Sequence, residues 1–200
     1  MSEIFTLLHT VGKLKDVERF HGKFWDDYNI DKHETSAEHT WRLCFFLMTL
    51  KDKISVSFDY QKTLELLLIH DIAEIYAGDT PSTESFWNNP VLEIKYQKEE
   101  KALEKILHNI QDITIQTKIK SLWIEYEKRE SIEAKIASTI DKLEWAFQAS
   151  EYLEKIWIFE EHRIFSIKYT EALLWLDNYI DTLILEVIEK FKQLPTKNSL

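Results

Sequence analysis

The chain has 200 residues, 44% of them hydrophobic, and contains only three glycines and three prolines. This length and apolar content suffice for one domain with a substantial core, and the scarcity of glycine and proline argues against a fold rich in strands and turns. The formal net charge of -10 disfavours a broad surface for a nucleic-acid polymer or an anionic membrane, because those partners favour a basic face. We therefore expect an all-α fold, a single helical bundle over residues 1–193, with a flexible tail at 194–200.

The sequence also predicts a cytoplasmic protein. No run approaches the ~20 apolar residues of a membrane-spanning helix, and the first residues show no basic leader followed by an apolar segment and a cleavage site. The single cysteine, Cys44, cannot form an internal disulfide, and its apolar surroundings predict a buried thiol rather than a nucleophile.

Apolar residues recurring every three or four positions predict a first amphipathic helix from Phe5 to about Phe20. A segment without helical periodicity follows and is expected to be a loop. Thr35 and Glu38 have the spacing of a capping box, which predicts that a second helix begins there and continues to Leu50.

A third helix is expected to begin after Ser57 or Asp59 and to end at Gly78. It is apolar nearly all round, which predicts a place at the centre of the bundle. Further helices are expected over residues 91–110, 113–126, 131–155 and 165–191.

Residue types that bind metal ions occur on three of these predicted helices. His39 opens the second helix, the dipeptide His70-Asp71 interrupts an apolar run in the third, and Asp141 belongs to the segment 131–155. Burying a histidine and an aspartate side by side is costly without a compensating charge, and helical bundles commonly build metal sites from facing helices. Two imidazoles and two carboxylates suit one divalent ion per chain, whether cobalt, manganese, zinc, iron, nickel or magnesium.

Glu74 follows His70 by four residues and Asp71 by three, so it projects from nearly the same helix face. A divalent ion can lower the pKa of a bound water from near 16 to roughly 7, which makes hydrolysis possible at neutral pH. Glu74 is placed to exchange a proton with that water or with the leaving group.

A purely structural interpretation is the alternative, because a histidine in an apolar helix is more often a hydrogen-bonded core residue than a ligand. The cluster of His70, Asp71 and Glu74, followed by Asp79, would nevertheless leave several polar groups uncompensated without an ion. His33 competes with His39 as a ligand but precedes the capping box in a loop.

The pattern Glu38-His39, then LLLIHDIAEIYAGD, then DKLEWAFQA resembles the HD-domain metal-dependent phosphohydrolases, in particular the 5′-deoxynucleotidases and their eukaryotic relatives. The resemblance extends from about Leu14 to about Tyr152. It implies an all-α fold, a homodimer, and a small phosphorylated substrate, a deoxynucleoside monophosphate. It also implies particular site residues: metal ligation by His39, His70, Asp71 and Asp141, Glu74 as the catalytic acid or base, Asp79 contacting the sugar, and Arg19 engaging the substrate.

The chain departs from this pattern near Arg19. Phe20 follows it where the bacterial nucleotidases have tryptophan, and the next segment carries the acidic residues Asp26, Asp27 and Asp31. Carboxylates near a phosphate pocket weaken anion binding unless they point away. Two alternatives therefore stay open: hydrolysis of another small phosphate ester or nucleotide, and a non-catalytic metal-bound nucleotide sensor or scaffold.

Overall fold

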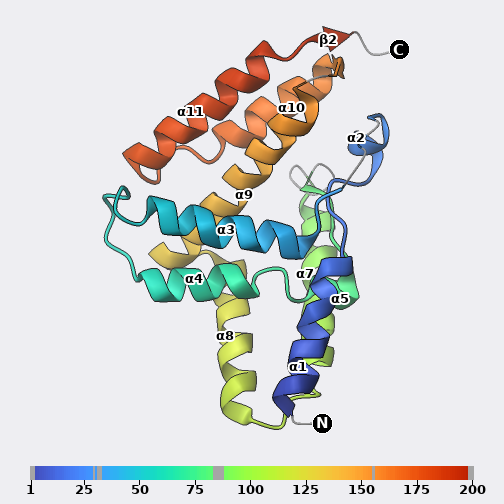
Figure 1. Ribbon diagram of the computed structural model, residues 1–200, viewed down its shortest axis with the longest axis vertical. Helices are drawn as coiled ribbons and strands as arrows, with labels where there is room; N and C mark the ends of the chain where they lie inside the picture. Colours follow the sequence, from blue (N-terminus) through green and yellow to red (C-terminus); the bar gives the residue numbers. More distant parts are fainter. Residues whose placement is uncertain (1–2, 29, 31–32, 83–87, 155, 198–200) are drawn as a thin grey trace.

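The computed structural model describes residues 3–28, 30, 33–82, 88–154 and 156–197, and these are almost entirely helical (Figure 1). The only strands among them are β1 (Ile158–Phe159) and β2 (Thr196–Lys197), which pair in parallel. The expectation of an all-α bundle is thus confirmed. Within the same residues, no helix is long and apolar enough to cross a membrane.

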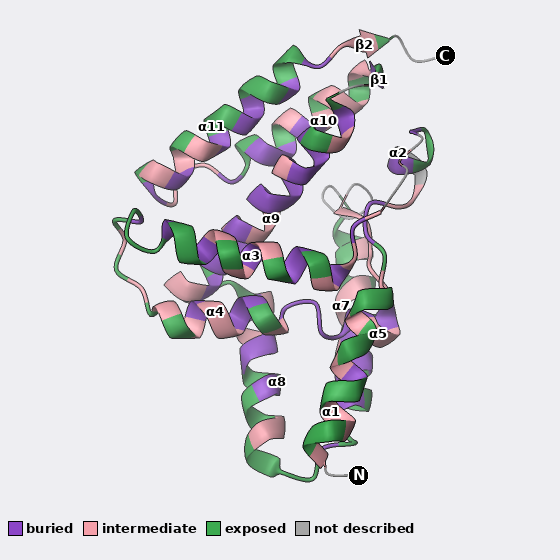
Figure 2. Ribbon diagram, viewed as in Figure 1, coloured by how far each residue is buried: buried purple, intermediate pink, exposed green. Residues whose placement is uncertain are grey.

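The central element is α9 (Ile132–Leu153), which begins where the Ser131 side chain accepts a hydrogen bond from the Ala134 backbone N–H. Buried positions follow one another along α9 more densely than along its neighbours (Figure 2). The helices packed against it are α3 (Ser36–Leu50), α4 (Tyr60–Ile69), α8 (Ile113–Lys128), α10 (Glu160–Glu171) and α11 (Asn178–Gln193). The expectation that the third helix is central is wrong, because its first part, α4, packs only against α3, α8 and α9 among these helices and leaves Leu68 51% exposed.

The second helix begins as predicted. The Thr35 hydroxyl accepts from the Glu38 backbone N–H, and the Glu38 carboxylate accepts from the Thr35 backbone N–H, so both halves of the capping box are present at the start of α3. Of the two possible caps for α4, Asp59 is the one whose side chain accepts from the backbone, at Lys62.

The first helix is shorter than predicted. It comprises α1 (Glu3–Val11) and continues as a 3-10 helix, η1 (Gly12–Asp16), before the chain becomes extended. The backbone N–H of Arg19 donates to the Glu34 carbonyl at 2.8 Å, and that of Ser36 donates to the Val17 carbonyl at 2.9 Å. These two backbone hydrogen bonds hold Arg19 in an extended segment, outside any helix and beside the start of α3. The following segment, expected to be a loop, contains the short helix α2 (Lys23–Asp26).

The third helix is interrupted between α4 and α5 (Glu74–Ala77). Over this interval the backbone tightens: the N–H of Ile72 donates to the carbonyl of Ile69, and the N–H of Glu74 to that of Asp71, both at 3.0 Å. The His70 ring also bonds the Leu67 carbonyl of the preceding turn at 2.7 Å. In winding of this kind the side chains at positions i and i+3 lie one above the other, so Glu74 lies on the same face as Asp71.

A second hydrophobic cluster joins α5 to α8 and to α7 (Asn89–Leu107), around the fully buried Trp123. The last predicted helix is in fact two, α10 and α11, which pack against each other. Asp177 separates them because its side chain caps α11 by accepting from the backbone N–H groups of Tyr179 and Ile180.

The segment expected to be a flexible tail is partly held in the fold. Leu194 is buried, and Thr196 and Lys197 pair with β1, with the Lys197 ammonium 4.4 Å from the centre of the Phe159 ring. Residues 198–200 lie outside the described part of the chain.

Candidate metal centre and active site

Three helices bring His39, His70 and Asp141 together. His39 lies in the first turn of α3, His70 follows α4, and Asp141 lies in the middle of α9. One ligand atom from each lies within 4.8 Å of those from the other two. Residues separated by about a hundred positions in the sequence thus form one cluster at the crossing of these helices.

The two imidazoles are oriented as metal ligands. His70 donates through Nδ1 to the Leu67 carbonyl, so the lone pair on its Nε2 faces Asp71 Oδ2 at 3.0 Å and Asp141 Oδ1 at 4.0 Å. His70 Nε2 is buried without a hydrogen-bond partner. An acceptor nitrogen facing carboxylate oxygens is unfavourable unless a cation lies between them. The donor set therefore fits a divalent ion.

His39 is held by carboxylates at both ring nitrogens. Its Nδ1 lies 2.5 Å from Glu144 Oε2, and its Nε2 lies 3.0 Å from Asp141 Oδ1. Burial and the charge of Arg19 would lower the pKa of His39, but the hydrogen bonds to Asp141 and Glu144 raise it to about 10. The carboxylates around His39 thus stabilise a positive charge at this position, which a bound metal ion can supply in place of a proton. Donation from Nδ1 to Glu144 leaves Nε2 as the ligand atom.

Asp71 is fixed by a salt bridge with Arg19, whose Nη1 lies 3.1 Å from Asp71 Oδ2. Burial alone would raise the pKa of Asp71, but its contact with His70 and the charges of Arg19 and His39 outweigh burial and hold the pKa well below its usual range. Arg19 is itself buried, and its Nε also lies 3.5 Å from Glu34 Oε2. Asp71 is therefore an anion whose position is set by a residue far away in the sequence.

Glu74 is almost completely buried and accepts a hydrogen bond from the Ser36 hydroxyl at 2.7 Å. Burial and the neighbouring carboxylates of Asp71 and Asp79 raise the pKa of Glu74 well above its ordinary value. A raised pKa favours the protonated carboxyl group, which can donate its proton as a general acid does.

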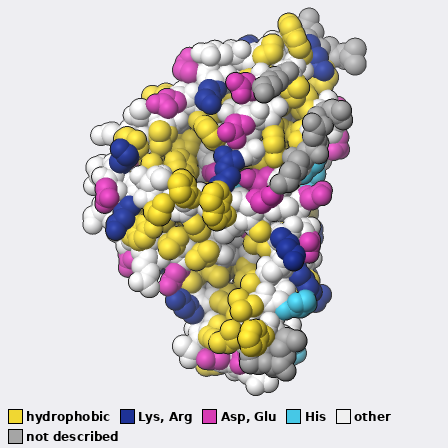
Figure 3. Space-filling view, viewed as in Figure 1, with side chains coloured by type: hydrophobic (Ala, Val, Ile, Leu, Met, Phe, Trp, Pro, Cys, Tyr) yellow, Lys and Arg dark blue, Asp and Glu magenta, His cyan; other side chains and the backbone are white. Residues whose placement is uncertain are grey.

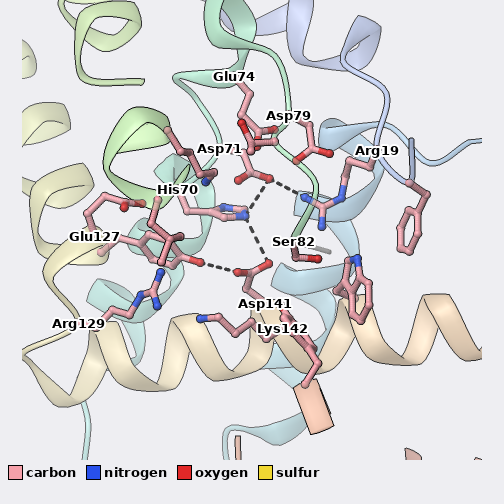
Figure 4. A pocket seen from close by; sticks show the side chains of 17 residues that line it. Arg19, His70, Asp71, Glu74, Asp79, Ser82, Glu127, Arg129, Asp141 and Lys142 are labelled. Atoms are coloured by element: carbon pink, nitrogen blue, oxygen red, sulfur yellow. Dashed lines mark hydrogen bonds and ion pairs between the residues drawn. The ribbon is translucent and has the colours of Figure 1, made fainter. Parts of the chain in front are cut away.

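These groups line a cavity of about 280 Å³ (Figure 4). His70, Asp71 and Asp141 lie between two walls: Arg19 and Asp79 belong to one, and Arg129 and Lys142 belong to the other. His21 Nε2 lies 3.4 Å from Asp79 Oδ2. The structure therefore brings all seven site residues predicted from the sequence into one region, with His39 behind the cavity and the others lining it.

Several cavity residues were not predicted as site residues from the sequence. The cations Lys95, Arg129 and Lys142 line the cavity, as does Tyr126, whose hydroxyl donates to Asp141 Oδ2 at 2.7 Å. Burial and the proximity of Arg129 lower the pKa of Lys142 to about 8. Only Lys142 carried a sequence signal, its place directly after Asp141.

Thr80 and Ser82, which the sequence places in a loop after Asp79, also line the cavity. Thr83 of the same loop lies outside the described residues.

Other residues considered from the sequence lie elsewhere. His33 donates from Nδ1 to the Arg19 carbonyl at 3.1 Å and lines a different cavity. Asp26 and Asp27 are exposed, so they do not oppose an anion in the active-site cavity, and Asp31 is outside the described residues. Cys44 is half-buried on α3 rather than buried, and burial raises the pKa of its thiol.

Comparison with known proteins agrees with this geometry. The family model described as HD domain matches residues 11–172. The chain is 31% identical over 149 residues to 5′-deoxynucleotidase HDDC2 of Bos taurus, covering 74% of this chain and 67% of the relative. It is 30% identical over 155 residues to 5′-deoxynucleotidase hdd1 of Schizosaccharomyces pombe, covering 76% and 73%.

Solved structures share the fold. One, described as a predicted metal-dependent phosphohydrolase from Magnetospirillum magnetotacticum MS-1, has a TM-score of 0.72 at 24% identity and covers 96% of this chain and 95% of its own. A conserved hypothetical protein from Pyrococcus furiosus has a TM-score of 0.66 at 27% identity, covering 95% and 99%. The resemblance drawn from the sequence motifs is confirmed, and the chain belongs to the HD-domain family.

Proposed function

We propose that this chain is a metal-dependent phosphohydrolase that converts 5′-deoxynucleoside monophosphates to deoxynucleosides and phosphate. The observation that carries this function is the convergence of His39, His70 and Asp141, with Asp71 beside them, next to a buried carboxyl group in a cavity. The relatives named 5′-deoxynucleotidases support the substrate class.

His39, His70, Asp71 and Asp141 would hold one divalent ion per chain, and mixed nitrogen and oxygen ligands accept cobalt, manganese, zinc, iron, nickel or magnesium. When bound, such an ion polarises a phosphoryl oxygen and lowers the pKa of water. The His39 Nδ1 hydrogen bond to Glu144 and the His70 Nδ1 hydrogen bond to Leu67 hold both rings in ligand orientation before any ion arrives.

Glu74 would act as the catalytic acid or base. Its raised pKa favours the protonated form, so it can deliver a proton to the leaving 5′-oxygen of the sugar and thereby avoid release of an alkoxide. The Ser36 hydroxyl bond to Oε2 fixes the carboxyl group in one orientation. The position of Glu74 in the cavity wall gives the substrate direct access to it.

Arg19 and Asp79 would contact the substrate from the same side of the cavity. Arg19 has five N–H donors, and its contacts with Asp71 and Glu34 engage only some of them. Asp79 can accept a hydrogen bond from a sugar hydroxyl, and its carboxylate disfavours a ribose by crowding the 2′-hydroxyl.

The experiment that tests this function is phosphate release from 2′-deoxy and ribo 5′-monophosphates and simple phosphate esters. Metal-stripped protein is reloaded separately with cobalt, manganese, zinc and magnesium, and the metal-free protein is the control. We expect metal-dependent release that favours deoxynucleotides. Phosphate release from other esters alone would exclude the nucleotidase assignment. The absence of phosphate release from every compound, with metal bound, would favour a nucleotide sensor.

We also infer a cytoplasmic homodimer. The single cysteine supports a reducing compartment. Exposed apolar side chains gather over α3 in Figure 3, and Trp41 and Phe45, 67% and 52% exposed, stack on each other there. Exposed apolar patches of this kind are typical of interaction surfaces. Light scattering on the purified protein tests the assembly, and a monomer at working concentrations would exclude it.

A further inference from the structure

The cavity is lined by four cations whose charges are not equally available to a ligand. Arg19 is paired with Asp71 at 3.1 Å and with Glu34 at 3.5 Å, and Lys95 is paired with Glu99 at 3.0 Å. These two cations are therefore neutralised by carboxylates of the protein itself. An anionic substrate that relied on them alone would compete with buried carboxylates for the same donors.

Arg129 and Lys142 differ from them. Among the described residues, neither forms an ion pair with a carboxylate, although Glu127 lines the same wall. The Lys142 ammonium donates to the hydroxyl of Ser138, one turn earlier on α9. Arg129 is exposed and Lys142 is half-buried. Two neighbouring cations repel each other, and an anion bound between them would relieve that repulsion.

The two side chains reach this wall from different elements. Arg129 directly follows α8 and has the left-handed conformation, with φ of 53°, which ends the helix. Lys142 follows Asp141 on α9. Figure 4 shows both on the side of Asp141 that lies away from Arg19, with their charged ends near each other. Arg129 and Lys142 thus lie next to the predicted metal ligands but form no ion pair with the carboxylates of Asp71 or Asp141.

We propose that Arg129 and Lys142 are the principal phosphate-binding residues of this site, and that Arg19 mainly positions Asp71. This inference rests on the proposed function, since it assigns the substrate's phosphate to one wall of that cavity. A guanidinium binds two phosphate oxygens through parallel N–H donors, and an ammonium adds a compact charge. Two free cations match the two negative charges of a phosphate monoester. The sugar then extends toward Asp79 on the opposite wall.

A second cavity supports this assignment. It has a volume of about 370 Å³, and Arg129 and Lys142 line it together with Lys135, Ser138 and Thr139. The pair therefore separates the active-site cavity from another space that also offers a cation and hydroxyl groups.

Binding of inorganic phosphate, measured by calorimetry on the metal-loaded protein, tests the inference without requiring turnover. We expect Lys142→Gln and Arg129→Gln each to weaken phosphate binding about tenfold or more, because each removes a charge-assisted hydrogen bond. The matched control is Lys135→Gln, which removes an exposed cation from the same helix and the second cavity only, and should change binding less than about twofold.

Two further measurements keep the result interpretable. Melting temperatures without phosphate identify a variant that fails to fold, and Lys142→Arg, which keeps the charge, should recover most of the phosphate affinity. Phosphate affinity that is unchanged in both glutamine variants, or absent in the folded wild type, would overturn the inference.

The outcomes also separate this inference from the proposed function. If the pair binds phosphate but no deoxynucleotide is hydrolysed, the substrate assignment fails and the phosphate site stands. If deoxynucleotides are hydrolysed with the same KM in wild type and Lys142→Gln, and phosphate binding is equal, the phosphate site alone is refuted.

Discussion

Replacing Glu144 by glutamine should weaken metal binding although Glu144 is not itself among the predicted ligands. The carboxylate is buried on α9, with Oε2 2.5 Å from His39 Nδ1 and Oε1 3.0 Å from Arg42 Nε. The substitution keeps the shape of the side chain but removes the charge that orients His39 and increases its basicity.

The expected magnitude follows from that one contact. A hydrogen bond to a charged group contributes about 1.5–3 kcal/mol, and loss of such a partner of a metal-ligating histidine typically costs about 10–100-fold in metal affinity. These two ranges agree, since tenfold corresponds to about 1.4 kcal/mol. We therefore expect the dissociation constant for zinc or cobalt to rise about 10–100-fold in Glu144→Gln.

Competition with a fluorescent chelator measures that constant directly. The matched control is Glu151→Gln, the same chemical change on the same chain segment, because Glu151 also pairs with Arg42, at 3.6 Å, but is exposed. The control should bind metal like the wild type. If Glu144→Gln also binds metal within about twofold of the wild type, then Glu144 does not position His39 as a ligand.

Three other substitutions test separate parts of the structure. Asp71→Ala should abolish both metal retention and phosphate release, measured by metal analysis and turnover; a variant that keeps its metal and full activity would refute the ligand assignment. Glu74→Gln should keep its metal but lower kcat about 10²–10⁴-fold, and an unchanged kcat would remove Glu74 from the mechanism. Asp177→Ala removes the cap of α11 and the bond from the Ser55 hydroxyl at 2.6 Å, so urea unfolding should show a loss of about 0.5–2 kcal/mol with the metal site intact; an unchanged midpoint would contradict the capping role.

Local signals in the sequence were sufficient for much of the helical framework. The capping box of Thr35 and Glu38 fixed where α3 begins, and Asp59 and Ser131 cap α4 and α9 within a few residues of the expected positions. Signals of this kind act between residues three or four positions apart, so they can be read without knowing the rest of the chain.

The predicted helix boundaries were wrong where a segment forms hydrogen bonds with residues far away in the sequence. The periodic pattern that extended the first helix toward Phe20 does not reveal that the Arg19 backbone pairs with Glu34. The pattern that joined α10 to α11 likewise hides the cap at Asp177, whose second oxygen binds Ser55 more than a hundred residues earlier. Tertiary hydrogen bonds of this range override the weaker preference of a segment for helix.

For the candidate site, the residue types that can hold a metal and the place of Glu74 one turn beyond them could be predicted from local sequence patterns. The cost of burying charge makes such residues conspicuous in an apolar run, which is why His70 and Asp71 could be found. Which cations lack a carboxylate partner could not be predicted, because it depends on contacts between segments far apart in the chain. Arg19 is neutralised by Asp71 and Glu34, whereas Lys142 and Arg129 face the same cavity without an ion pair to any described carboxylate. Charge compensation depends on distances in space, and a sequence does not contain those distances.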